Sequence, residues 1–201
     1  MQKENDSRLS AIYETYLSVI SPFIIQLEAL DGEFPVEILN EIRSIFTHLA
    51  RCNSTEKEQI YEENIIKAER HVKRAVLDCF KYLCVAYDEY FRRFTKLNRN
   101  VDLSFVDNGY FIQKLSSLHN NAVHNKTEAQ KKELVAENIE DVFGDYEKAY
   151  NSYAEVYNLI QESTESIDFV KHKAATKETI NTIFGIVGVV SLILTIIFQF
   201  V

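Results

Sequence analysis

The chain ends in a long run without charge, and this run limits its possible folds more than any other feature. From Ile180 to Phe200 the residues are mostly Ile, Val, Leu and Phe, and Glu178 is the last charged residue before them. As a helix, these 21 residues span roughly 31 Å, the thickness of a bilayer's hydrocarbon core. A buried core helix is the alternative, but such helices are usually shorter and keep a polar face. We therefore predict a transmembrane helix over residues 179–201.

The residues that flank this run predict its orientation. Lys171, Lys173 and Lys177 precede it, and cationic residues beside a span tend to stay in the cytoplasm. The N-terminal residues MQKENDSR are polar and of mixed charge, unlike a secretory signal. We expect residues 1–175 to form a cytosolic domain, with the lipid bilayer as a partner of the C-terminal segment.

The predicted span also carries small and polar residues on one side. At about 100° per residue these fall within roughly an 80° arc; they are Asn181, Gly185, Gly188, Thr195 and Gln199. Membrane helices associate through such faces, because small residues let backbones approach and amides pair across the contact. This pattern predicts a homo-oligomer whose seam is either a dry contact or the wall of a water-filled path. A monomeric anchor with incidental polar residues is the alternative.

The remaining sequence indicates an all-α fold. Gly and Pro are scarce, at five and two residues, and no alternating strand pattern stands out. Helical spacing of apolar residues predicts a bundle of long antiparallel helices over residues 5–30, 35–52, 55–97, 110–123 and from 127 onward, with a connector at 98–108. We expect Pro22 to kink the first helix. Thr55 and Glu58 have the spacing of a capping box at the start of the third.

The last predicted helix has a regular apolar and aromatic seam. Its members alternate spacings of three and four, and are Ile139, Phe143, Tyr146, Tyr150, Tyr153, Tyr157, Ile160, Thr164 and Ile167. This heptad pattern is typical of a coiled coil or of a bundle core. The same phase continues into the polar face of the predicted span, so one helix could run unbroken into the membrane. Packing inside a monomeric bundle and packing between copies both fit the pattern.

Charge and cysteine usage narrow the functional classes. The formal net charge is −8, which argues against nonspecific nucleic-acid binding over the whole surface. The three cysteines, Cys52, Cys79 and Cys84, are an odd number without CxxC spacing. We expect them to be reduced, partly buried thiols in the cytosol.

A local cationic stripe stands out in this acidic chain. On the third predicted helix, one arc carries Lys67, Arg70, His71, Arg74 and Lys81, and on the second, a polar edge carries Asn40, Arg43, Thr47 and Arg51. Arg and Lys on rigid helices suit phosphate groups. We predict an anionic nucleotide or oligonucleotide ligand bound by Arg43, Arg51, Lys67, Arg70, His71 and Arg74. The alternative is a solvated helix face that is balanced by Glu62, Glu63, Glu69 and Asp78.

The segment EIRSIFTHLAR resembles part of the HEPN families, helical domains that often cleave RNA. Arg43 and His48 fit their Rx4H motif. The resemblance implies an active cleft between two protomers, with His48 as acid or base and Arg43 as phosphate ligand. On an ideal helix these two side chains point about 140° apart, which does not suit that role.

Other motifs for chemistry are lacking in the sequence. There is no glycine-rich phosphate loop, nucleophile elbow or CxxC pair. His119 and His124 have no cysteine or carboxylate at metal-ligand spacing, so a metal site is not expected. We predict neither a cofactor nor enzymatic activity.

The combination of segments EIRSIFTHLAR and NIIKAERHVKRAVLDC with a terminal span resembles membrane effectors of bacterial antiphage defence of the Hailong type. Such a resemblance implies an ion channel-forming protein in the bacterial inner membrane, with its N-terminal domain in the cytoplasm. It also implies control by an oligonucleotide that a partner nucleotidyltransferase makes. A membrane-tethered HEPN-like RNase and a tail-anchored scaffold are the alternative functions.

Overall fold

The computed structural model describes residues 2–32 and 34–173, and every regular element in these ranges is a helix. The prediction of an all-α bundle is therefore confirmed for this part of the chain. Two compact units are present. We call residues 1–93 and 117–157 the bundle unit, and residues 94–116 and 158–201 the tip unit, of which the second segment is described up to residue 173.

The first predicted helix is confirmed, with a widened turn in its middle. It runs through α1 (Gln2–Thr15), a π-helical turn (Tyr16–Ile20) and α2 (Ser21–Asp31). The wide turn ends at Ile20, two residues before Pro22, whose ring crowds the carbonyl four residues earlier and which has no N–H to donate. Ser21 N–H donates to the Tyr16 carbonyl, five residues back. A bend of the helix axis at Pro22 stays a prediction.

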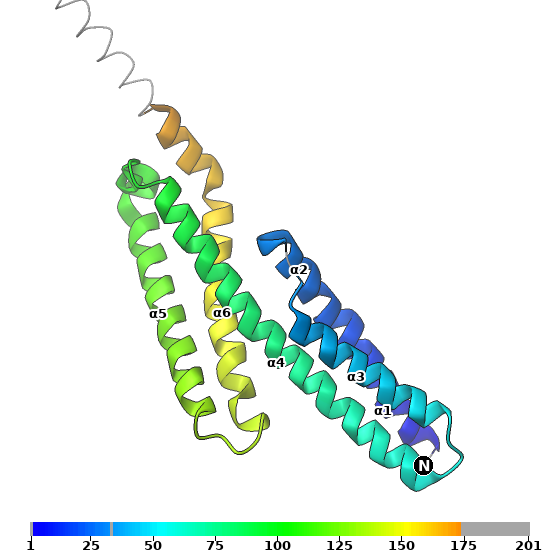
Figure 1. Ribbon diagram of the computed structural model, residues 1–201. Coiled ribbons are helices and arrows are strands. Elements are labelled where there is room, and N and C mark those ends of the chain that lie inside the picture. The colour runs from blue at the N-terminus through cyan, green and yellow to red at the C-terminus, as the bar shows by residue number, and fades with distance from the viewer. Residues whose placement is uncertain (1, 33, 174–201) are drawn as a thin grey trace, which may run out of the picture. The chain divides into compact units, whose positions relative to one another are not determined.

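Two antiparallel helices follow, α3 (Val36–Asn53) and α4 (Glu58–Leu97). Figure 1 shows α3 and the α1–α2 helix lying along the first half of α4. The predicted capping box at the start of α4 is wrong: Thr55 Oγ1 accepts from the Lys57 N–H at 3.1 Å, and the helix begins only at Glu58. Thr55 therefore stabilises the turn before α4.

The second half of the chain corrects one predicted boundary. It contains a 3-10 segment and two α-helices, η2 (Leu103–Gly109), α5 (Tyr110–Glu133) and α6 (Glu140–Glu162). The predicted break between residues 123 and 127 is wrong, because α5 continues for ten more residues. Ala129 is fully buried on this continuation, and Asn125 Nδ2 donates to Ser152 Oγ of α6 at 2.8 Å. Packing here overrides the weak helix propensity of the asparagines.

The tyrosine seam of α6 packs inside the bundle unit. Tyr146 and Tyr153 are only 3% and 1% exposed. The Tyr150 ring lies 5.3 Å from that of Phe80 and 6.2 Å from that of Tyr87, both on α4. These residues thus form the core between α4 and α6 of one chain. Ser163 interrupts the helix with a turn, and residues 164–173 continue as helix.

No helix within residues 2–32 and 34–173 is long and apolar enough to cross a membrane. The span predicted at 179–201 lies outside the described residues. The same holds for its polar face, Asn181, Gly185, Gly188, Thr195 and Gln199.

The three cysteines are buried and form no disulfide, as expected from their number and spacing. Burial raises the pKa of Cys79 and of Cys84 to about 12. These thiols are therefore protonated at neutral pH and act as small apolar core residues.

Candidate functional site

Two histidines meet where α3 packs on α4. The ring of His48, on α3, stacks on the ring of His71, on α4, with centroids 5.3 Å apart and planes 18° from parallel. Each Nδ1 atom has a partner on the opposite helix: Asn64 Oδ1 for His48, at 2.9 Å, and Glu41 Oε2 for His71, at 2.6 Å. Both rings are half-buried. We call these four residues the histidine pair and its supports.

The supports fix which ring nitrogen carries the proton. Asn64 Nδ2 donates to the Ile60 carbonyl at 2.8 Å, so Asn64 Oδ1 faces His48 and must accept from its Nδ1–H. The Glu41 carboxylate likewise accepts from His71 Nδ1–H. Neither Nε2 atom has a partner among the described residues. Both Nε2 atoms are thus available to a ligand, and each donates a hydrogen bond to an anion when its ring is protonated.

Exposed cations surround the histidine pair. Lys67 and Arg74 lie four residues before and three after His71, so they share its face of α4, and Arg70 lies beside them. On α3, Arg51 follows His48 by three residues. All four cationic side chains are exposed. The site thus combines the guanidinium groups of three arginines and the ammonium group of one lysine with two imidazoles. Such donors suit the oxygen atoms of phosphate groups.

These four cations have no hydrogen bond or ion pair to their side chains among the described residues. Several cations elsewhere in the bundle unit are paired, such as Lys73 with Glu140 at 2.9 Å and Lys132 with Asp145 at 2.7 Å. Arg43 and Lys148 are exposed without such a partner in the described ranges, so the cationic stripe differs from them by its position beside the two imidazoles.

Two of the acids that could have balanced the stripe face another helix. Glu69 accepts from Arg8 of α1 through both of its oxygens, at 2.7 Å each, and Glu62 accepts from the same guanidinium. The hydrogen bonds that Arg8 donates to Glu69 and Glu62 raise the pKa of its guanidinium. These two carboxylates therefore face α1 and form no ion pair with Lys67, Arg70 or Arg74.

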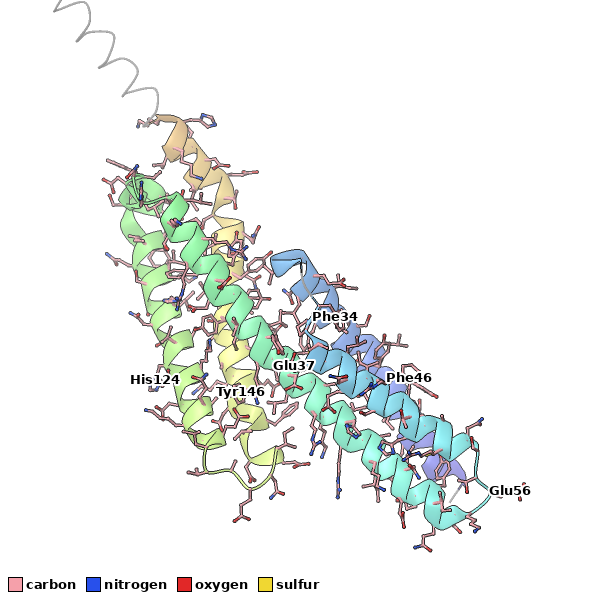
Figure 2. The ribbon with its side chains drawn as sticks, viewed as in Figure 1. Phe34, Glu37, Phe46, Glu56, His124 and Tyr146 are labelled. Atoms are coloured by element: carbon pink, nitrogen blue, oxygen red, sulfur yellow. The ribbon has the colours of Figure 1, made fainter. Side chains whose placement is uncertain are left out.

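The structure separates two further residues from the histidine pair. Arg43 is exposed on α3, about 140° around the helix from His48, and its guanidinium has no partner among the described residues. Lys81, which belonged to the predicted stripe, pairs with Glu133 of α5 and lies over the Tyr146 ring. Figure 2 labels Tyr146 on α6 and Phe46 on α3, and Phe46 lies on the side of α3 that faces away from α4.

Carboxylates bound the site at its other end. A hollow of about 320 Å³ beside Arg74 is lined by Glu41, Asp78 and Glu133, among other residues. Burial, with the neighbouring carboxylates, raises the pKa of Asp78. Glu37, labelled in Figure 2, accepts a hydrogen bond from Tyr82 that raises the pKa of this phenol to about 12. Arg74 therefore lies at the border between the cationic face and these carboxylates.

Sequence reasoning found the cations but missed the histidine pair and its supports. A signal was present in the spacing. Glu41 and His48 are seven residues apart, as are Asn64 and His71, and two turns of helix return a side chain to nearly the same face. Antiparallel packing then sets each histidine against the partner on the facing helix.

Among residues 2–32 and 34–173, no group of three or more His, Cys, Asp or Glu residues is placed to hold a metal ion. No protein-family model, curated protein or solved structure matches this chain. The interpretation of the site therefore depends on its geometry and charge.

Proposed function

We propose that this protein is a membrane-anchored effector of bacterial antiphage defence whose ion conduction is controlled by an anionic nucleotide or oligonucleotide. The ligand binds the cationic face around the histidine pair. Residues 179–201 anchor the chain in the inner membrane and, through Asn181, Gly185, Gly188, Thr195 and Gln199, line or brace the conducting assembly. A partner nucleotidyltransferase supplies the ligand.

One observation supports the ligand half of this proposal most strongly. Arg51, Lys67, Arg70 and Arg74 are exposed without ion pairs in the described residues, although the chain as a whole has a net charge of −8. An acidic protein has carboxylates in excess, so unpaired cations gathered at one place indicate a site for an external anion. The supports of His48 and His71 leave both Nε2 atoms open to the ligand, and each Nε2 donates once its ring is protonated.

Helix α4 offers a route from the ligand to the tail. Its first half carries Lys67, Arg70 and Arg74, and its last residues belong to the tip unit, which also contains residues 158–173. No Gly or Pro interrupts residues 58–97. A ligand shifts a closed assembly to an open one, or the reverse, only if it binds the two with different affinity. A shift from 1:99 to 99:1 needs a difference of about 5.5 kcal/mol.

Self-association needs a surface other than the tyrosine seam, which is buried within one chain. Exposed apolar side chains on the α1–α2 helix, including its π-helical turn, and on α3 are suited to it: Leu17, Leu39 and Phe46 are 69%, 52% and 61% exposed. Glu14 and Arg43 are exposed on the same two helices without ion pairs among the described residues. In a two-fold symmetric dimer, Glu14 of one copy can lie against Arg43 of the other copy, and the reverse.

The alternatives make different demands on the same residues. A HEPN-like RNase requires Arg43 and His48 to act on one phosphate, whereas these residues lie on different sides of α3. A tail-anchored scaffold requires the span but no polar face within it. Both remain predictions that the following experiment separates from ours.

The experiment measures membrane potential in bacteria that express the full chain. We expect wild type to depolarise the cells when its ligand state favours conduction, and N181L or Q199L to abolish this, because each removes an amide from the seam. Ile197→Leu, an apolar exchange in the same span, is the matched control. A second variant replaces the span with an unrelated apolar helix. A scaffold should keep its activity after this exchange, whereas a channel should lose it.

Loss of toxicity in His48→Ala, with no effect of N181L or Q199L, would contradict the proposal and favour RNA cleavage. Self-association is tested separately by the mass of the protein in mild detergent. Phe46→Glu should lower this mass, whereas Leu134→Glu, at a site that is 85% exposed in the α5–α6 connection, should not.

A further inference from the structure

The tip unit exposes an unusual set of apolar side chains. Leu97, Phe105 and Tyr110 lie at the end of α4, in η2 and at the start of α5, and are 81%, 73% and 63% exposed. Large apolar side chains that gather on one short connection mark a contact surface more often than a solvated loop. We call these three residues the apolar tip.

The connection that carries the apolar tip is built to hold it outward. Val106, next to Phe105, is buried with Phe111 and Leu115, so Phe105 projects while its neighbour anchors the loop. Asp102 Oδ1 accepts from Ser104 N–H at 3.1 Å and from Ser104 Oγ at 2.6 Å.

Three successive residues then adopt positive φ: Asp107 at 49°, Asn108 at 53° and Gly109 at 86°. Asp and Asn are the non-glycine residues that tolerate this conformation best. The tight reversal leads directly into Tyr110, so the exposed ring lies on a defined turn rather than on a slack loop.

Charge also distinguishes this unit from the rest of the chain. The tip unit contains six Lys or Arg and six Asp or Glu residues, so the bundle unit carries the whole net charge of −8. Lys96, Arg99 and Lys114 accompany the apolar tip, and the Lys114 ammonium lies over the Tyr110 ring. Aromatic rings beside Lys and Arg are typical of the headgroup region of membranes.

The position of the uncharged run indicates what covers the apolar tip. In Figure 1 the α4–α5 connection lies beside the last described turns, residues 164–173, within the same unit. Only six residues separate Lys173 from Ile180, where the run begins. They reach about 10 Å as a helix and at most about 25 Å when extended. A run inserted in a bilayer therefore keeps the tip unit at the membrane surface.

We propose that Leu97, Phe105 and Tyr110 insert into the headgroup region of the same bilayer that holds residues 180–200. This contact holds the tip unit on the lipid surface. A movement of α4 is then transmitted to residues 180–200 and is not absorbed by the residues that connect the tip unit to them. The inference rests on the membrane half of the proposed function.

The test uses the absence of tryptophan from the chain. Full-length Phe105→Trp, with Tyr110→Trp as a second reporter, is reconstituted in phosphatidylcholine and phosphatidylglycerol vesicles, with or without lipid brominated near the headgroup. We expect blue-shifted emission that brominated lipid quenches. Leu134→Trp, in the bundle unit, is the exposed control and should not be quenched. Phe198→Trp reports on the tail with deeply brominated lipid.

Each result points to one conclusion. If Phe198→Trp is quenched but Phe105→Trp and Tyr110→Trp behave like Leu134→Trp, the tip contact is wrong and the membrane anchor stands. If Phe198→Trp is not quenched, the anchor in the proposed function is wrong. Quenching of Phe198→Trp and of either tip reporter supports both.

Discussion

The salt dependence of ligand binding gives the sharpest prediction about the cationic face. Lys67, Arg70 and Arg74 lie on one face of α4 without competing ion pairs, so a single-stranded oligonucleotide should engage all three. Neutralising three phosphates gives a slope of log affinity against log salt of about −2.1, or about −0.7 for each contact. Raising monovalent salt from about 50 to about 200 mM should then weaken binding about 18-fold.

Removal of one cation should change this slope by a defined amount. Arg74→Gln should bring it to about −1.4, so that the same rise in salt weakens binding only about 7-fold. Lys132→Gln is the matched control, because it removes the same charge from a lysine that already pairs with Asp145 at 2.7 Å. The assay is fluorescence anisotropy of a labelled mixed-sequence hexanucleotide with the full-length protein in detergent.

Two results would refute the reasoning. A wild-type slope near zero would mean that no phosphate contacts form. An equal loss of slope in Arg74→Gln and Lys132→Gln would mean that the oligonucleotide responds to overall charge and not to the face around the histidine pair.

Three further predictions concern the fold. The raised pKa of Asp78 shows that ionisation of its carboxyl is unfavourable in the folded state. Asp78→Asn should therefore raise the melting temperature at about pH 7, and this gain should vanish at about pH 3, below the ordinary carboxyl range. Equal gains at both pH values would contradict this. Leu83→Ala, at a fully buried site, should lower the free energy of unfolding by about 2–5 kcal/mol, whereas Val85→Ala, 47% exposed, should change it by no more than about 0.5 kcal/mol; urea unfolding measures both. Cys79 and Cys84 should react with a thiol reagent only as fast as the protein opens, and rapid labelling of native protein would show that their burial is not maintained.

Much of the fold could be predicted from local patterns. The region from 55 to 97 has no helix breaker and a sustained apolar period, so α4 is specified by its own sequence to within a few residues. The α5 boundary was missed because Ala129, the fully buried residue of the added segment, is small and gives no periodic signal. Its burial depends on the close approach of other helices, which no local window contains.

The candidate site divides in the same way. The cations of α4 could be recognised from sequence, because charge and helical phase suffice to place them on one face. The stacking of His48 on His71 depends on the register between two antiparallel helices, which packing decides. The same is true of Arg8, whose pairing with Glu62 and Glu69 turns these carboxylates towards α1.

The central claim is that an anion on this face controls ion flow through the tails. Its most direct test is ion flux from vesicles that contain the full-length protein, with and without the hexanucleotide, for wild type and for the combined Lys67→Gln, Arg70→Gln and Arg74→Gln variant. The account predicts that the hexanucleotide changes the flux of wild type, upward or downward, and leaves the flux of the variant unchanged. Flux that is absent from wild type, or that responds equally in both proteins, would contradict it.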